Sequence, residues 1–498
     1  MKSALHSLPS WFLLCLTFGS LSVLPLSLSA GELETALSSV SFNVTASGSG
    51  KVVEYSFLRK QNSVDYQYEI QSSPDLVDWS NVLFDSAALT EVGTAEVRTV
   101  VTEAVPEGTV YLRLQITSIP KTITLQAGMT INNALSLTKP GDTLVLPNGN
   151  YAKQTLTKQF PADVTIKAQQ TNKAIIAGML LSKAQHLSFR GIKFTDPFRL
   201  DGASDITIAG CTLDAGASTE GSLEIYGQGA NGPTHHITVE NCTISNGGRT
   251  IFFAGHFAPS ENWNHDIVIR NNQITCGTNV GIQISGGRDL LITENKFNTT
   301  RSGAILTAGA TRVEISRNRI EGPSLGMQIA TPGREWDPFS GVEHMISSDI
   351  LVANNVIIST ANSCIMLSAC HDISIVYNTL AGTGTLSTIH RTPHDYANKF
   401  VILEGNSNIR VWNNIMERIT LDTLDPRPVF ESHNLVRTGG AGDGLITSDP
   451  KFSETTTYSL SASSPALDKA IFTDDTPTVD FTGEERGSPA DLGAMERF

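Results

Sequence analysis

The chain has 498 residues, enough for two or three domains with a large buried core. Its 35 lysines and arginines against 49 aspartates and glutamates give a formal charge of −14, which argues against a nucleic-acid binder, because such proteins need a basic face. Charged residues make up only 17% of the chain and 41 residues are glycine, which argues against a coiled coil and against a charged disordered polymer. The composition favours a β-rich globular protein.

Residues 1–30 have the pattern of a secretory signal peptide. Lys2 precedes an apolar stretch that extends to Leu28, and a small-residue cleavage site follows at Ala30. Glycine, proline and serines interrupt this stretch, which argues against a membrane anchor, and no later segment is apolar enough to span a bilayer. We therefore expect a protein that is secreted, periplasmic or attached to the cell surface. The five cysteines that remain after cleavage are too few and too scattered for a disulfide scaffold.

Residues 31–120 alternate apolar and polar side chains in short runs separated by polar turns. The runs are 52–58, 66–70, 95–101 and 110–116. This pattern predicts the strands of a small antiparallel β-sandwich. Residues 68–80 resemble small β-sandwich modules that are appended to secreted bacterial enzymes, so we expect an accessory domain here.

A nine-residue phrase recurs nine times in the middle of the chain. The phrases begin at His186, Asp205, His236, Asp266, Asp289, Arg312, Asp349, Asp372 and Asn408. The shortest common spacing is 23 residues, and the longer spacings contain insertions. Each phrase has apolar residues at positions two, four and nine and a polar pair at positions six and seven. This arrangement predicts two short strands joined by a bend.

A third short strand precedes each phrase, as in 282–285, 305–308 and 365–368. Three short strands in about two dozen residues form one turn of a solenoid, and each strand then pairs with its copy about 4.8 Å away. Because parallel crossovers are right-handed, the sequence predicts a right-handed parallel β-helix over residues 121–445. The predicted fold class is all-β: this β-helix, preceded by the small β-sandwich domain.

Position seven of the phrase is asparagine in six successive repeats. These residues are Asn272, Asn295, Asn318, Asn355, Asn378 and Asn414. We expect their side-chain amides to form an internal ladder, with a backbone that tolerates the left-handed conformation. Cys211 and Cys242 occupy the same position in earlier repeats, where we favour buried thiols over a disulfide.

Both ends of the predicted solenoid resemble known secreted proteins. Residues 133–151, NALSLTKPGDTLVLPNGNY, resemble the opening of polysaccharide lyases of the alginate lyase and chondroitinase B type. The resemblance implies a short helix that caps the first turn of the solenoid. Residues 449–452, 464–468 and 491–496 resemble the closing segment of bacterial secreted β-helix proteins, which implies a C-terminal cap over 446–498.

Three insertions follow strands that precede a phrase, at residues 255–265, 331–348 and 392–399. Tight turns lie between them, so we expect walls with a trough along one edge of the rod. The first two walls lie three turns of the solenoid apart, about 14 Å at 4.8 Å per turn. This span suits two or three sugar units, and the expected partner is therefore a polysaccharide. We expect the protein to be a monomer.

The walls are rich in ionisable and aromatic side chains. The candidate catalytic residues are His256, Arg334, His390, Arg391, His394 and Tyr396, and the candidate substrate-binding residues are Trp263, Glu335, Trp336, Asp337 and Lys399. β-Elimination from a uronate needs a group that neutralises the carboxylate, a base for the C5 proton and an acid for the leaving oxygen. The arginines could neutralise the carboxylate. His390, His394 or Lys399 could be the base, and Tyr396 could be the acid. The sequence thus favours a secreted lyase acting on an acidic polysaccharide.

Two other functions stay open. A glycoside hydrolase would use paired carboxylates, for which Glu335, Asp337, Glu343 and Asp395 are candidates. A glycan-binding protein without catalysis would use the same loops only to hold its ligand. No cofactor is required by the sequence, although His256 with His265, Glu343 with His344, or loop carboxylates that hold Ca²⁺ leave a metal open.

The resemblance to these lyases does not extend to their catalytic residues. The lyases carry a lysine on one turn of the solenoid and an arginine–histidine pair on the next, but the corresponding strands here, 281–287 and 303–310, contain neither. The segment 392–396, TPHDY, resembles the Asp-Pro-His-Asp motif of alginate C5-epimerases, with Thr392 in place of the first aspartate, their essential acid.

Overall fold

A computed structural model describes most of the chain. The described residues are 11–17, 20–24, 41–47, 50–60, 66–73, 81–89, 96–105, 110–227, 229–255, 262–276, 280–298, 303–322, 325–330, 347–359, 361, 363–389, 394–396, 399–401, 406–421, 429–440, 442–454 and 456–497. They belong to two compact units. The N-terminal unit comprises residues 1–123 with 137–143, and the solenoid unit comprises 124–136 with 144–498.

The N-terminal unit contains two antiparallel sheets, with strand orders β2-β1-β8-β5-β6 and β3-β4-β7. The strands are β1 (Trp11–Thr17), β2 (Ser20–Leu24), β3 (Ser41–Ser47), β4 (Gly50–Lys60), β5 (Tyr66–Ser73), β6 (Asn81–Asp85), β7 (Glu96–Val105) and β8 (Val110–Ser118), with a 3₁₀ helix η1 (Ser86–Ala88). The four predicted runs fall in β4, β5, β7 and β8, while the face-to-face packing of a sandwich stays a prediction. Cleavage after Ala30 would remove β1 and β2, which lie at the edge of β8.

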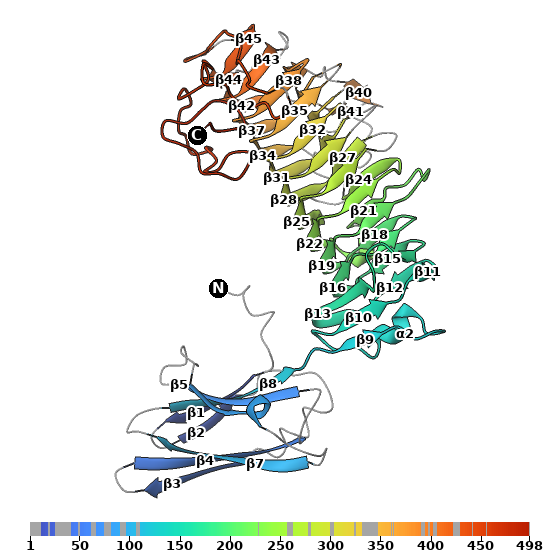
Figure 1. The fold of residues 1–498 in the computed structure, drawn as a ribbon, viewed down its shortest axis with the longest axis vertical. Helices are drawn as coiled ribbons and strands as arrows, with labels where there is room; N and C mark the ends of the chain where they lie inside the picture. The colour runs from blue at the N-terminus through green and yellow to red at the C-terminus, as the bar shows by residue number, and fades with distance from the viewer. Residues whose placement is uncertain are drawn as a thin grey trace. The chain divides into compact units, whose positions relative to one another are not determined.

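The solenoid unit winds through three short strands in each complete turn, here called a coil (Figure 1). The first strands form one 13-stranded sheet: β9 (Thr122–Thr124), β10 (Thr143–Leu146), β13 (Gln159–Ala168), β16 (Gln185–Arg190), β19 (Ser204–Ala209), β22 (His235–Glu240), β25 (Asn264–Arg270), β28 (Gly287–Thr293), β31 (Ala310–Ser316), β34 (Ser348–Ala353), β37 (His371–Val376), β42 (Ser407–Trp412) and β44 (Val429–Ser432).

The second and third strands of the coils share a 22-stranded sheet. The second strands are β11 (Gly149–Tyr151), β14 (Ala174–Ile176), β17 (Lys193–Phe194), β20 (Thr212–Asp214), β23 (Thr243–Ser245), β26 (Gln273–Thr275), β29 (Lys296–Asn298), β32 (Arg319–Glu321), β35 (Val356–Ser359), β38 (Thr379–Gly382), β43 (Ile415–Thr420) and β45 (Leu435–Thr438). The third strands are β12 (Gln154–Leu156), β15 (Met179–Ser182), β18 (Phe198–Asp201), β21 (Leu223–Tyr226), β24 (Arg249–Ala254), β27 (Val280–Ser285), β30 (Ile305–Ala308), β33 (Met327–Ala330), β36 (Ile365–Ser368) and β39 (Thr385–Ile389).

Each strand pairs in parallel with its copy one coil further on, and identical positions of the phrase therefore lie in register. Position two, for example, aligns Ile267 with Leu290, Leu290 with Val313 and Val313 with Ile350. These side chains are at most 3% exposed. The predicted fold class, a parallel β-helix, is confirmed. At its start the short helix α2 (Ile131–Leu135) is N-capped by Thr130, whose Oγ1 accepts from the backbone N–H of Asn133.

The asparagines of position seven form the expected ladder. Asn295 Nδ2 donates to Asn318 Oδ1 at 3.0 Å, and the backbone N–H of Asn295 donates to the same oxygen. The pattern repeats from Asn272 to Asn434, and all of these side chains are buried. At its beginning the backbone N–H of Cys242 donates to Asn272 Oδ1, and the thiols of Cys211 and Cys242 are free and buried.

One detail of the expected ladder is wrong. The left-handed backbone belongs to position six, where Asn271 has φ +54° and Asn354 +56°, and to position one, where Asp266 has φ +54°. Position seven is instead the residue that points inward. The bend turns at position six, whose side chain points away from the inside of the rod, while the amide of position seven bonds inside the rod.

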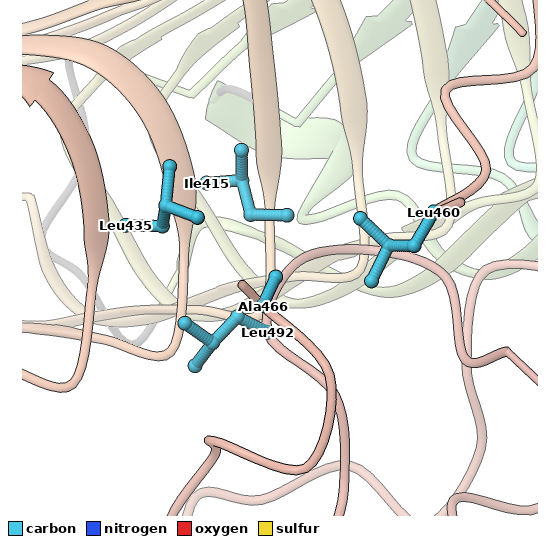
Figure 2. Packing of buried hydrophobic residues seen from close by; sticks show 5 residues of the cluster. All are labelled: Ile415, Leu435, Leu460, Ala466 and Leu492. Carbon is cyan, nitrogen blue, oxygen red and sulfur yellow. The ribbon is translucent and has the colours of Figure 1, made fainter. Parts of the chain in front are cut away.

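The C-terminal segment packs on the last coils of the rod. Leu460, Ala466 and Leu492 pack on Ile415 of β43 and Leu435 of β45 (Figure 2). The segment then returns along the outer face of the 13-stranded sheet, where Ala490 packs on Ala353, Val376 and Tyr377. Within the described residues no helix is long and apolar enough to cross a membrane.

A buried arginine fastens this segment. The Arg486 side chain is 1% exposed and forms an ion pair with Glu496 at 3.2 Å, while its NH2 group donates to Asn354 Oδ1 at 2.6 Å and to the Gly493 carbonyl. Its guanidinium lies 4.1 Å from the centre of the Tyr377 ring. Burial lowers the pKa of Arg486 and raises the pKa of Glu496. The packing of the C-terminal segment therefore depends on a charge pair that is almost completely shielded from water.

Replacing Asn318 by alanine should lower the free energy of unfolding by roughly 3 kcal/mol, because buried N–H groups of Asn295 then lose their acceptor. Chemical denaturation measures the change. Gln273→Ala, on the exposed face of β26, is the matched control and should shift stability by less than about 0.5 kcal/mol. Equal effects of the two variants would rule out the ladder as a source of stability.

Arg486→Met should destabilise the solenoid unit by about 3–5 kcal/mol, because the buried Glu496 carboxylate then lacks its partner. The double variant Arg486→Met with Glu496→Gln should recover part of this loss in thermal unfolding. A double variant less stable than the single one would show that the pair's charges are not what matters.

Candidate functional site

The three insertions start from one edge of the rod, as their spacing predicts. They follow β24, β33 and β39, which all belong to the column of third strands. The last residues of these strands align through the intervening coils, since Ala330 pairs with Ser368 and Ser368 with Ile389. The inserted residues therefore leave the coils at the carboxyl ends of the third strands.

Most of the predicted site residues lie outside the described part of the chain. These are His256, Arg334, Glu335, Trp336, Asp337, His390 and Arg391. His394 and Tyr396 belong to β40 (His394–Tyr396), which pairs antiparallel with β41 (Lys399–Val401) and sets Tyr396 opposite Lys399. The third insertion thus contains a short hairpin that holds three of the predicted residues.

Trp263 is the one predicted site residue whose side chain is described, and it is 3% exposed. The chain has returned to the coil at this point, directly before β25 begins at Asn264. A ring that is this buried offers no open face on which a sugar could stack, so the expectation of an exposed Trp263 is corrected: its indole belongs to the packing of the coil.

A group of polar and aromatic side chains lies on the outer face of β18, β21 and β24, beside the first insertion. In β21 the apolar Leu223 and Ile225 are fully buried in the core, so Glu224 and Tyr226 point outward. Register places Glu224 between Arg199 of β18 and Phe252 of β24. Together with Glu220, Tyr226 and Arg249 these residues form what we call the β21 cluster.

Glu224 is held in place by several donors. Arg199 Nε donates to Glu224 Oε2 at 2.7 Å, and the backbone N–H of Gly221 donates to Oε1 at 3.0 Å. The NH2 group of Arg199 lies 2.6 Å from Glu224 and 3.2 Å from Glu220. The two carboxylates therefore approach each other across one guanidinium. Glu224 is only 2% exposed, so this arrangement compensates a charge that water does not reach.

The ring of Tyr226 contacts Arg199 and Phe252. The Arg199 guanidinium lies 4.5 Å from the centre of its ring, and the Phe252 ring meets it edge-on at 6.2 Å. Burial, and then the charge of Glu224, raise the pKa of Tyr226. The phenol consequently keeps its proton at neutral and mildly alkaline pH, which suits a proton donor rather than a base.

Arg249 lies on the other side of Phe252, with its guanidinium 4.4 Å from the ring centre. Its Nε atom is buried and has no hydrogen-bond partner among the described residues. Unlike Arg199, it forms no ion pair with any carboxylate in the described part of the chain. It is therefore the arginine of this cluster whose charge no described carboxylate neutralises.

The β21 cluster was not predicted from the sequence, although the sequence contains a signal for it. The alternation in Leu223–Tyr226 places a carboxylate and a phenol on the outside of a strand, next to the first insertion. What the pattern does not show is the pairing of Arg199 with Glu224, since the insertion at residues 214–222 hides the register between them.

The described residues contain no group of three or more histidine, cysteine, aspartate or glutamate side chains placed to hold a metal ion. The chemistry of the β21 cluster, taken alone, is that of a guanidinium, a phenol and paired carboxylates. Such groups can neutralise an anion, donate a proton and, in the carboxylate pair, accept one.

Comparison with known proteins agrees with the architecture. A family model described as a right-handed β-helix region matches residues 177–334 and 262–420. These overlapping stretches include β18, β21 and β24 and extend to β43. The hand predicted from the chirality of parallel crossovers agrees with this description, and the chain is a right-handed parallel β-helix over these coils. No curated protein matches the sequence.

Several solved structures share part of the arrangement. An alginate lyase from Paenibacillus sp. str. FPU-7 has 16% identity and a TM-score of 0.38 over 54% of this chain and 94% of its own. The A-module of the mannuronan C-5 epimerase AlgE6 from Azotobacter vinelandii has 14% identity and a TM-score of 0.40 over 64% and 93%. A family 28 exopolygalacturonase from Yersinia enterocolitica has 10% identity and a TM-score of 0.37 over 82% and 98%.

Arg199→Met should destabilise the protein by about 2 kcal/mol, because Glu224 is then left buried without its cation. Adding Glu224→Gln, which keeps the bond from Gly221, should restore much of this loss. Chemical denaturation of the single and double variants measures the coupling. Additive losses in the double variant would show that the two side chains do not depend on each other.

Proposed function

We propose that this protein is a secreted polysaccharide lyase that cleaves a uronate-containing glycan by β-elimination, with the β21 cluster as part of its active site. The observation that carries the proposal is the combination of an arginine whose charge no described carboxylate neutralises with a protonated phenol on the same outer face. Both contact the Phe252 ring, Arg249 at 4.4 Å and Tyr226 at 6.2 Å.

In the proposed reaction the uronate carboxylate binds to Arg249, which stabilises the negative charge that develops when the C5 proton is removed. The electron pair of the C5–H bond forms the C4–C5 double bond, and the C4–O bond breaks. Tyr226, which its raised pKa keeps protonated, gives its proton to the leaving oxygen. Proton transfer from the protonated base back to Tyr226 completes the cycle.

The base is proposed to come from the insertions. We propose His256, which follows β24 by two residues in the sequence, as this base, because His390, His394 and Lys399 belong to the third insertion, which starts five coils or about 24 Å along the rod from β24. In this scheme Arg334 or Arg391 supplies further positive charge, and Trp336, Glu335 and Asp337 contribute to substrate binding. The proposed reaction uses side chains alone, so chelation by EDTA separates it from a mechanism in which Ca²⁺ neutralises the carboxylate.

The test is to incubate the purified protein with alginate, chondroitin, pectin and a neutral glycan, and to follow the ultraviolet absorbance of the unsaturated uronate. The wild type should form this product from at least one acidic glycan. Tyr226→Phe should lower kcat by about a hundredfold or more, and Arg249→Gln should lower kcat/KM by a similar factor. Arg270→Gln, an exposed arginine on the 13-stranded sheet, is the matched control and should leave both constants unchanged.

A second candidate function rests on the two carboxylates of the cluster. Glu220 and Glu224 lie 3.2 and 2.6 Å from the same Arg199 nitrogen, and a close carboxylate pair is the requirement for retaining glycoside hydrolysis. New reducing ends without the unsaturated product, lost in Glu220→Gln, would favour a hydrolase over the lyase. Binding of a glycan without either product would favour a non-catalytic glycan-binding protein and contradict both enzymatic proposals.

A further inference from the structure

A groove lies on the outer face of the 13-stranded sheet, on different strands from the β21 cluster. It crosses β25, β28, β31 and β34 and has a volume of about 600 Å³. Its floor is formed by position three of the phrase, where Val268, Leu291 and Leu351 are half-buried and Glu314 is exposed. Four coils at the strand spacing make a trough about 14 Å long.

One wall of the groove is formed by position one of the phrase. Asp266, Asp289, Arg312 and Asp349 line it, and all four have the left-handed backbone, with φ between +52° and +55°. The repeated conformation gives these side chains the same backbone geometry in each coil. Hydrogen bonds from Arg312 and Arg288 lower the pKa of Asp289, which keeps this carboxylate charged.

The lining of the groove is anionic. It contains four carboxylates, including Glu314, against the single guanidinium of Arg312. Asp289 is paired with Arg312, and His265 lies 2.6 Å from Asp266. Asp349 and Glu314 form no ion pair in the described part of the chain, and both are exposed. These two carboxylates, beside an apolar floor, are available for a cation.

The next coils of the same face already bind a polypeptide, which is the chain's own C-terminal segment. Leu351 lines the groove and also packs in the cluster that Ala490 joins. Here the charges are reversed: the sheet presents Arg410 in position three, and the segment brings Asp475, whose Oδ2 lies 3.1 Å from the guanidinium. The face packs against a polypeptide segment where opposite charges meet.

We propose that the groove binds an extended basic segment of a partner protein, as a continuation of the surface that the C-terminal segment covers. Lysine or arginine stems would pack on Val268, Leu291 and Leu351, and their charged ends would pair with Asp349 and Glu314. The proposal concerns a different face from the β21 cluster and does not depend on the lyase activity.

The test is the binding of a short fluorescent peptide that alternates lysine and valine to the full-length protein, followed by anisotropy at physiological salt. The peptide should bind, and an analogue with glutamate in place of lysine should not. Asp349→Lys should weaken binding about tenfold or more, and Leu291→Ser, which leaves the charge unchanged, should weaken it by several-fold.

Asp163→Lys is the matched control, because it makes the same charge change on the same sheet but on β13, outside the groove. It should change the affinity less than twofold. Equal loss in Asp163→Lys and Asp349→Lys would show attraction by net charge alone and overturn the proposal. Failure of the peptide to bind would also overturn the proposal. The same holds if a glucosamine oligomer binds in place of the peptide and Asp349→Lys weakens the binding of that oligomer.

Discussion

The parallel hydrogen bonds between neighbouring coils constrain everything else in the solenoid unit. They fix each strand in register with its copy about 4.8 Å away, so that every position of the repeat becomes a column of stacked side chains. Inside the rod, the side chains of a column can contact only one another and the rest of the core. Isoleucines pack on their copies in the next coil, and each asparagine amide forms a hydrogen bond with the next asparagine. A shift of one residue would turn the core positions outward, and the fold therefore tolerates insertions only between strands.

This constraint explains why the fold could be predicted from one sequence and the site could not. Few folds other than a solenoid fit a repeat of alternating apolar positions. The inward column that contains Asn318 could be predicted because asparagine recurs at position seven of the phrase. The turn position was predicted one residue too late because Asn271 and Asn272 are the same residue type. Only the structure shows that the first turns the backbone while the second bonds inside.

The candidate site depends on contacts that have no period. Arg199 and Glu224 are 25 residues apart across an insertion, and their pairing follows from register that the sequence does not reveal in an inserted coil. Trp263 shows the opposite difficulty. It follows a polar insertion, and its neighbours in sequence favour an exposed ring, but it lies directly before β25 and is buried. Composition alone does not separate these two situations.

The distribution of charge bears on how a chain with a net charge of −14 could act on an anionic polymer. In the β21 cluster two arginines accompany two glutamates, whereas the groove of the 13-stranded sheet carries four carboxylates and one arginine. Excess negative charge on one sheet is screened beyond about 8–10 Å at physiological salt, so it affects a ligand on the other sheet weakly. The two faces can thus serve ligands of opposite charge.

A crystal structure of the Tyr226→Phe variant with a bound uronate oligosaccharide tests the central claim most directly. The account predicts a sugar carboxylate within hydrogen-bonding distance of the Arg249 guanidinium, and a glycosidic oxygen facing the position of the missing hydroxyl. An oligosaccharide that lies on another face of the rod, with Arg249 uncontacted, would contradict it.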